Sequence, residues 1–154
     1  GLAAELLIAR DGLNKKSNAS QLIDLLELLN GCICCTFKDS LVATLGLLLE
    51  KRLDLDYILI EASGMANPGP IASVFWLDDA LKSRLKLDGI VTLVDAYHIV
   101  GQLQHTKEAA QQIAYVDQLL INKVDLLQTD DKIKKVENVL QTLHPTAPMQ
   151  TTTY

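Results

Sequence analysis

All three cysteines of this chain lie within the five residues Gly31-Cys32-Ile33-Cys34-Cys35. Three thiolates can occupy three corners of a tetrahedral zinc site, at about 2.3 Å from the metal. Cys32 and Cys34 can face the same way in an extended stretch, and Cys35 can join them where the chain turns. We therefore expect Cys32, Cys34 and Cys35 to bind zinc, with the fourth position left to water, a side chain or a client protein.

Three alternatives to a zinc site remain open for this cysteine cluster. Copper(I) also accepts trigonal sulfur ligands, so ligand softness alone does not identify the metal. A redox pair is a second alternative, although the Cys-x-Cys-Cys spacing differs from the usual Cys-x-x-Cys. Inert, buried cysteines are the third.

A second candidate site is the segment Leu120-Ile121-Asn122-Lys123-Val124-Asp125, in which a hydrophobic run ends in Asn-Lys-x-Asp. The Asp125 carboxylate would accept two hydrogen bonds from the N1–H and the exocyclic amine of guanine, which adenine cannot supply. Asn122 would fix the loop and contact the base, and the stem of Lys123 would cover the base. The alternative is an ordinary polar turn between a strand and a helix.

The segment Tyr57-Ile58-Leu59-Ile60 is followed by Glu61-Ala62-Ser63-Gly64. Ligands of parallel α/β sheets bind beyond the carboxyl ends of the strands. Glu61 can hold Mg²⁺ there, directly or through water. Gly64 lets a backbone N–H approach a terminal phosphate because it has no Cβ. The alternative for Glu61 is a carboxylate that caps the next helix.

His98 follows another hydrophobic run through Asp95-Ala96-Tyr97. It can act as a fourth metal ligand or as a base near a nucleotide. A surface or core histidine with satisfied hydrogen bonds is the favoured interpretation.

The elements that would position these residues alternate along the chain. Short runs rich in Leu, Ile and Val predict buried strands at residues 5–9, 57–60, 89–94 and 118–121. Helical patterns lie at residues 20–29, 40–52, 70–85, 104–114 and 130–143. This alternation predicts an α/β fold with a mainly parallel sheet and helices on both faces.

Length and composition limit the function classes. The 154 residues fit one domain, and the net charge of −5 without a basic stripe argues against a nucleic-acid partner. No apolar run reaches the roughly 18 residues that span a bilayer, so we expect no membrane partner. Clustered cysteines of odd number, without a leader sequence, favour a reducing compartment, and we expect the cytoplasm. The start at Gly1 suggests a fragment.

Several motifs in series resemble one family. They are Gly-Cys-Ile-Cys-Cys at 31–35, Ile-Glu-Ala-Ser-Gly-Met-Ala-Asn-Pro at 60–68, Leu-Asp-Gly-Ile-Val at 87–91 with Val-Asp-Ala at 94–96, and Ile-Asn-Lys-Val-Asp at 121–125. They resemble the CobW-type metal-homeostasis GTPases, particularly the branch of zinc-regulated GTPase metalloprotein activators. Lys38-Asp39-Ser40 and Ala72-Ser73-Val74-Phe75-Trp76 suggest that branch.

The resemblance implies a P-loop GTPase-like fold and a role for each matching position. Zinc ligands would be Cys32, Cys34 and Cys35. The segment that approaches the nucleotide and couples metal occupancy to GTP would be Cys35, Thr36, Phe37, Lys38 and Asp39. Glu61 would bind Mg²⁺, Gly64 would lie near the γ-phosphate, and the guanine-binding residues would be Asn122, Lys123, Val124 and Asp125. Such proteins hydrolyse GTP slowly and deliver zinc to a client metalloprotein.

The chain departs from the family pattern in two places. In the family, a Gly-rich loop ending in Gly-Lys-Ser/Thr provides most phosphate contacts, and this sequence contains no such loop. It also has Ala9-Arg10-Asp11-Gly12 where the family usually has Asn-Glu-Phe-Gly. We therefore expect a GTPase domain truncated at the N-terminus over residues 1–144, with a linker beginning at 145–154 and the C-terminal domain missing.

Three functional hypotheses follow. The first is a GTP-dependent zinc metallochaperone. The second is a non-catalytic metal-binding module or degenerate GTPase, which the missing phosphate-binding loop favours for this chain. The third is a redox-active thiol protein that uses Cys34 or Cys35.

Overall fold

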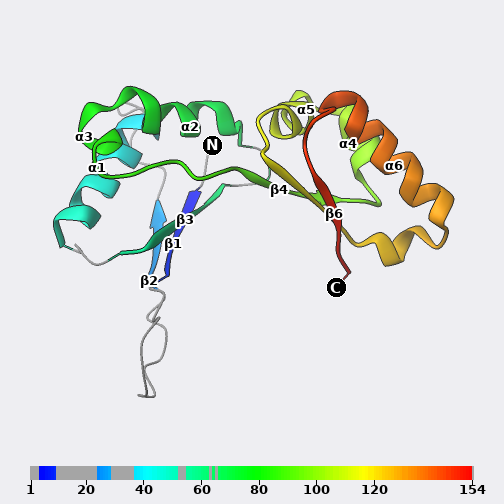
Figure 1. Ribbon diagram of the computed structural model, residues 1–154, viewed down its shortest axis with the longest axis horizontal. Helices are drawn as coiled ribbons and strands as arrows, with labels where there is room; N and C mark the ends of the chain where they lie inside the picture. Colours follow the sequence, from blue (N-terminus) through cyan, green and yellow to red (C-terminus); the bar gives the residue numbers. More distant parts are fainter. Residues whose placement is uncertain are drawn as a thin grey trace, which may run out of the picture. The chain divides into compact units, whose positions relative to one another are not determined.

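The computed structural model describes residues 4–9, 24–28, 37–51, 55–62, 64 and 66–153. Figure 1 shows the helices and strands in chain order. They fall into two compact units. Unit 1 comprises Gly1–Ala66 and Pro70–Lys86, and unit 2 comprises Asn67–Gly69 and Leu87–Tyr154.

Unit 1 contains an antiparallel sheet with strand order β2-β1-β3. Its strands are β1 (Ala4–Ala9), β2 (Asp24–Leu28) and β3 (Tyr57–Ala62). Its helices are α1 (Phe37–Lys51), α3 (Asp79–Lys82) and all but the first two residues of α2 (Pro68–Leu77). The buried residues of α1 recur at helical spacing and give the helix one apolar face; they are Leu41, Leu45, Leu48 and Leu49.

Unit 2 contains a parallel sheet with strand order β4-β5-β6. Its strands are β4 (Val91–Asp95), β5 (Gln118–Asn122) and β6 (Met149–Thr151). The connections are helices α4 (Ile99–His105), α5 (Lys107–Ala114) and α6 (Asp130–Leu143), with the 3-10 helix η1 (Val124–Leu127) after β5. Parallel strands joined through helices confirm the predicted α/β class.

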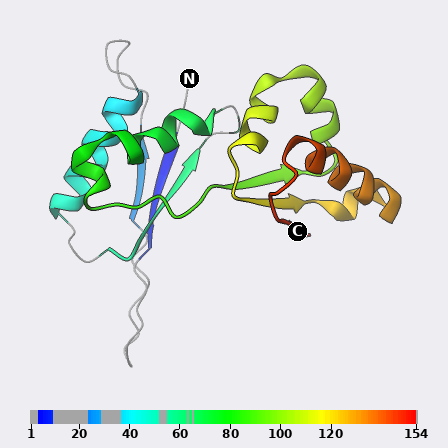
Figure 2. The ribbon, with the colours of Figure 1, turned by 45° about the horizontal axis from the view of Figure 1, so that its top comes forward.

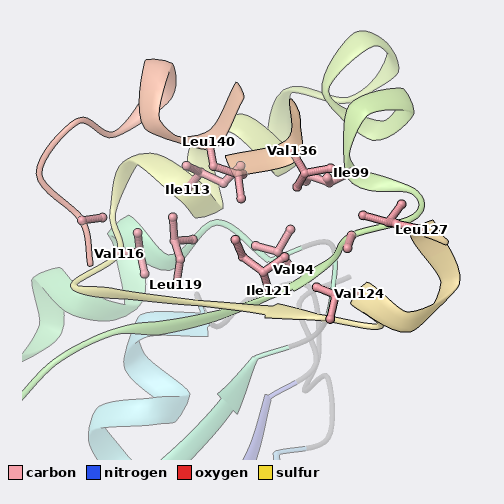
Figure 3. Close-up of a cluster of buried hydrophobic side chains, with 12 residues drawn as sticks. Val94, Ile99, Ile113, Val116, Leu119, Ile121, Val124, Leu127, Val136 and Leu140 are labelled. Carbon is pink, nitrogen blue, oxygen red and sulfur yellow. The ribbon is translucent and has the colours of Figure 1, made fainter. Parts of the chain in front are cut away.

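The hydrophobic core of unit 2 lies between its sheet and its helices (Figure 3). Figure 2 shows α4, α5 and α6 on the same side of this sheet. Leu119 and Ile121 of β5 are fully buried, as is Leu140 of α6. On β4, Val94 is buried, whereas Leu93 and Val91 are exposed, since alternate residues of a strand point to opposite faces.

Several sequence predictions are confirmed. The helix predicted at residues 130–143 is α6, Asp130–Leu143. The strands predicted at 57–60, 89–94 and 118–121 correspond to β3, β4 and β5 within two residues. The strand predicted at 5–9 corresponds to β1, but its antiparallel pairing was not predicted, because a short apolar run does not encode the direction of its partner.

One prediction of secondary structure is wrong. The described part of the helix predicted at 20–29 is strand β2, which pairs with β1, and a five-residue segment with three leucines suits either structure. Residues 145–154, where we expect a linker to begin, include the short strand β6 (Met149–Thr151), which pairs with β5. Its β-branched Thr151 fits a strand, and the pairing comes from a distant part of the chain.

Two helices predicted as continuous are each divided. Asp78 separates α2 from α3, and its Oδ1 accepts hydrogen bonds from Ala80 N at 3.1 Å and Leu81 N at 3.0 Å, which caps α3. Thr106 adopts an extended conformation between α4 and α5. Among the described residues, no helix is long and apolar enough to cross a bilayer.

Candidate functional site

The carboxyl ends of β4 and β5 lie side by side in unit 2. The two parallel strands are in register with Val94 opposite Ile121 and Asp95 opposite Asn122. Ala96 N donates a hydrogen bond of 3.0 Å to Asn122 O, which extends the pairing beyond β4. Polar side chains that follow these strands are therefore held at one edge of the sheet, where ligands of such sheets bind.

Among the residues whose burial the structure describes (41–50, 55–62, 64 and 66–153), Asn122 is the one that is both polar and buried, with 8% of its surface exposed. Its Oδ1 accepts a hydrogen bond of 2.8 Å from Lys123 N. No hydrogen bond donated by Asn122 Nδ2 is found among the described residues. Because buried polar groups are almost always paired, this amide leaves a donor for a ligand or for a part of the chain outside those residues.

Lys123 adopts a left-handed backbone conformation, with φ 60° and ψ 32°. This region costs a residue with a Cβ about 1–2 kcal/mol. The Nζ atom of Lys123 donates a hydrogen bond of 2.7 Å to Asp95 Oδ2. The two ends of this residue are thus fixed by Asn122 and Asp95.

The residues after Lys123 turn into η1. Val124 is buried in the core, and Leu126 N donates a hydrogen bond of 3.1 Å to Lys123 O. Asp125 is exposed, and within the described chain its carboxylate has no hydrogen-bond or ion-pair partner. Its carboxylate is therefore available to a ligand at the end of β5.

Asp95 ends β4 and binds groups from both strand ends. Its Oδ1 accepts hydrogen bonds from Tyr97 N at 3.0 Å and His98 N at 3.1 Å. Its Oδ2 lies 2.7 Å from Lys123 Nζ and 3.1 Å from His98 Nδ1. Burial alone would raise the pKa of this carboxyl. The hydrogen bonds from Lys123 and His98 and the charge of Lys123 outweigh it and lower the pKa from 3.8 to about 2.

His98 is a surface residue. Its side chain is 61% exposed, its Nδ1 faces Asp95, and its ring makes an edge contact with Tyr97 at 4.9 Å between centroids. This arrangement agrees with a surface histidine whose hydrogen bonds are satisfied. The sequence alone assigns no role to Asp95. Its second partner, Lys123, lies 28 residues away, and no local spacing joins the two residues.

The remaining predicted site residues belong to unit 1 or lie outside the described residues. Glu61 is exposed near the end of β3, and Gly64 lies in a turn two residues beyond that strand. Phe37, Lys38 and Asp39 form the start of α1. The predicted zinc ligands Cys32, Cys34 and Cys35, and the neighbouring Thr36, lie outside the described residues. No group of three potential metal ligands occurs in the part of the chain that the structure describes.

Comparison with known families gives one match over nearly the whole chain. Residues 4–151 match the CobW/HypB/UreG nucleotide-binding domain. Zinc-regulated GTPase metalloprotein activator 1 of Schizosaccharomyces pombe is 41% identical over 126 residues, which cover 81% of this chain and 30% of the relative. The zinc chaperone YjiA of Escherichia coli is 35% identical over 131 residues, covering 82% of this chain and 40% of the relative. The chain thus spans about a third of these relatives.

Two solved structures are similar to this chain. The Zn(II)-bound YjiA GTPase of E. coli superposes with a TM-score of 0.60 at 31% identity and covers 84% of this chain and 40% of that chain. A Zn(II)-bound triple mutant of YjiA, in which alanine replaces one glutamate and two cysteines, gives a TM-score of 0.62 at 28% identity. It covers 83% of this chain and 41% of that chain. These likenesses support the P-loop GTPase-like fold expected from the sequence.

Proposed function

Because the chain belongs to the CobW/HypB/UreG family of nucleotide-binding domains, we propose that it is part of a GTP-dependent zinc metallochaperone. In this role, unit 2 binds the guanine base, and the cysteine segment carries zinc as cargo for a client metalloprotein. Relatives named as a zinc-regulated GTPase metalloprotein activator and as a zinc chaperone support this combination.

The observation that carries the proposal is the arrangement of Asn122, Lys123 and Asp125 at the end of β5. Asn122 has a buried amide nitrogen without a partner in the described chain, and Asp125 has an exposed carboxylate. An amide donor and a carboxylate acceptor suit the edge of guanine, which presents both acceptors and donors. The residues present therefore fit this base, and adenine would leave the Asp125 carboxylate without its donors.

Glu61 is our proposed Mg²⁺ residue and Gly64 our proposed phosphate contact. Glu61 offers an exposed carboxylate, the donor that Mg²⁺ prefers, and Gly64 has open space where a Cβ would stand. Mg²⁺ bound there would neutralise phosphate charge during GTP hydrolysis. The segment Cys35–Asp39 would link the nucleotide to the cysteines.

Zinc handling is assigned to Cys32, Cys34 and Cys35. Three thiolates leave one position of a tetrahedral zinc site open, and a client ligand can enter there to take over the metal. GTP binding can favour release only if the zinc affinities of the two nucleotide states differ. The expected client is a metalloprotein whose own site binds zinc more tightly than these cysteines do.

The proposed recognition of guanine is tested by NMR titrations of the 154-residue chain with GDP, ADP and xanthosine diphosphate. The native chain is expected to prefer GDP. Asp125→Asn replaces one acceptor by a donor that matches O2 of xanthine, so the preference should move from GDP to xanthosine diphosphate. Loss of a hydrogen bond to a charged group predicts a GDP affinity about ten-fold to a hundred-fold lower.

Asp88→Asn is the matched control, since Asp88 is an exposed aspartate of unit 2 with no partner among the described residues. This variant should keep the native preference for GDP. Equal affinity of the native chain for GDP and ADP would contradict the proposed guanine site.

A second candidate function is a metal-binding module without turnover. The 154 residues contain no Gly-Lys-Ser/Thr loop for the phosphates, so nucleotide hydrolysis by this chain is the property that separates the two functions. The two functions are separated by measuring GTP hydrolysis of this chain beside a chain extended upstream by the corresponding segment of YjiA. Zinc binding without hydrolysis in both chains would favour the module, whereas hydrolysis in the extended chain would favour the GTPase.

A further inference from the structure

Lys123 forms a bridge between the ends of two strands. Its backbone continues β5, and its N–H is held by Asn122 Oδ1 at 2.8 Å. Its Nζ atom is held by Asp95 Oδ2, at the end of β4, at 2.7 Å. The four-carbon stem of Lys123 therefore spans the distance between the two strand ends.

The backbone of Lys123 supports a functional role for this bridge. A residue with a Cβ persists in the left-handed region where its surroundings determine its conformation, and such strain is concentrated at functional sites. Here both hydrogen bonds act on the one residue whose φ is 60° at the end of β5. The second residue with positive φ, Gln128, follows η1 and has no comparable pair of contacts.

We propose that Asp95 is a positioning residue of the nucleotide site, which fixes the Lys123 side chain so that its stem forms a preformed wall against the face of the base. This inference rests on the proposed guanine site. Asp95 and Asp125 then have separate tasks. Asp125 reads the edge of the base and sets selectivity, whereas the wall held by Asp95 contacts the face, which every purine has.

A preformed wall strengthens binding by removing the cost of ordering the lysine side chain when the ligand arrives. The long lysine side chain loses much rotamer entropy when it is ordered, and the ion pair with Asp95 restricts part of its freedom in advance. Loss of the bridge should therefore lower the affinities for GDP and for ADP by the same factor and leave the ratio of the two affinities unchanged. This pattern differs from the one expected for Asp125→Asn.

Two substitutions separate the bridge from the fold around it. In Asp95→Asn, the amide oxygen can still accept hydrogen bonds from Tyr97 N and His98 N, but the negative charge that faces Lys123 Nζ is lost. In Lys123→Met, an unbranched stem remains, but the ammonium group that Asp95 binds is lost. Urea unfolding of each variant verifies that it is folded before binding is measured.

The experiment is a double-mutant cycle on nucleotide affinity. NMR titrations with GDP and with ADP give the dissociation constants for the native chain, Asp95→Asn, Lys123→Met and the double variant. For an exposed ion pair, we expect each single substitution to lower the affinities for GDP and for ADP about three-fold. The double variant is expected to lose about three-fold as well, instead of about nine-fold, because either single change already breaks the bridge.

Asp88→Asn and Lys107→Met are matched controls, since both side chains are exposed and neither has a partner within the described chain. Both should retain native affinities. Native affinities in Asp95→Asn, or losses that multiply in the double variant, would overturn the role of Asp95 while leaving the guanine site intact. Absence of any GDP preference in the native chain would instead overturn the guanine site and, with it, this inference.

Discussion

Asp95 shows how one carboxylate at a strand end can connect several groups. One oxygen accepts two backbone N–H groups of the following turn, and the other faces Lys123 Nζ and His98 Nδ1. All of these partners favour the ionised form, and the pKa of Asp95 is accordingly about 2. A group whose pKa is lower in the folded state than in the unfolded state contributes stability above the unfolded pKa.

This pKa predicts how stability depends on pH. The contribution of Asp95 is present above about pH 4, the ordinary range of an aspartate in an unfolded chain. It is lost as the pH falls through about 2. Asp95→Asn should lower the free energy of unfolding at pH 7 by about 0.2–1 kcal/mol, the range of exposed ion pairs.

The measurement is urea unfolding at a series of pH values from 7 to 2. The difference in the free energy of unfolding between the native chain and Asp95→Asn should become smaller as the pH falls from about 4 toward about 2. A difference that stays constant over this range would show that the Asp95 charge does not stabilise the fold. Asp88→Asn serves as the exposed, unpaired comparison.

At the residue scale, the candidate site was predictable where its signal was local. Asn122, Lys123 and Asp125 occur within four positions after a hydrophobic run, and the structure places them together at the end of β5. The Lys123–Asp95 pair joins residues 28 positions apart, so only the parallel pairing of β4 and β5 brings it together. Zinc binding by Cys32, Cys34 and Cys35 stays a prediction, because these residues lie outside the described part.

Among the elements, α2 begins with a close backbone contact. A Cβ on Gly69 would stand 2.9 Å from Tyr115 Cζ and 3.2 Å from Asn67 Oδ1. Asn67 Oδ1 also accepts a hydrogen bond of 3.0 Å from Gly69 N. All three residues belong to unit 2, so the start of α2 packs on the residue that follows α5.

Gly69→Ala and Gly101→Ala should therefore change stability in opposite directions. Alanine in a helix is favoured over glycine by about 0.5–1 kcal/mol, and a Cβ on Gly101 in α4 would meet nothing within 4 Å. Gly101→Ala is thus expected to stabilise the chain by that amount. At Gly69, crowding of this kind costs about 1–3 kcal/mol, which exceeds the gain in propensity, so Gly69→Ala should destabilise.

Thermal and urea unfolding of both variants measure this difference. Adding Tyr115→Ala to Gly69→Ala removes the ring and should recover the part of the loss that the clash causes. Stabilisation by both glycine substitutions would contradict the packing described at the start of α2.

The elements themselves were largely predictable, but their divisions and pairings were not. The apolar spacing of α6 identifies its bounds, since Val136 and Leu140 recur four residues apart on its buried face. The break between α2 and α3 depends on the Asp78 side chain, which caps α3. A single Asp within a helical pattern does not predict such a break. β2 and β6 owe their structure to distant partners, β1 and β5, which a local pattern does not reveal.

At the scale of the whole molecule, the proposed function combines a nucleotide-binding domain with metal transfer. The chain spans 30% and 40% of two relatives, one named as a zinc-regulated GTPase metalloprotein activator and the other as a zinc chaperone. Zinc is also present in the solved YjiA variant with two cysteines replaced, so a bound ion alone does not identify the cargo site. We propose that nucleotide binding and metal transfer are linked, so that the zinc affinity of the cysteines depends on the bound nucleotide.

The most direct measurement of this linkage is zinc affinity in solution, determined by competition with a chromophoric chelator. It uses the chain extended upstream with the YjiA segment, with Mg²⁺ and either GDP or a non-hydrolysable GTP analogue, and compares native cysteines with Cys34→Ser. We predict at least about a ten-fold difference between the nucleotide states, or about 1.4 kcal/mol, and a loss of both the tight site and the difference in Cys34→Ser. Equal zinc affinity in both states, unchanged by Cys34→Ser, would contradict the account.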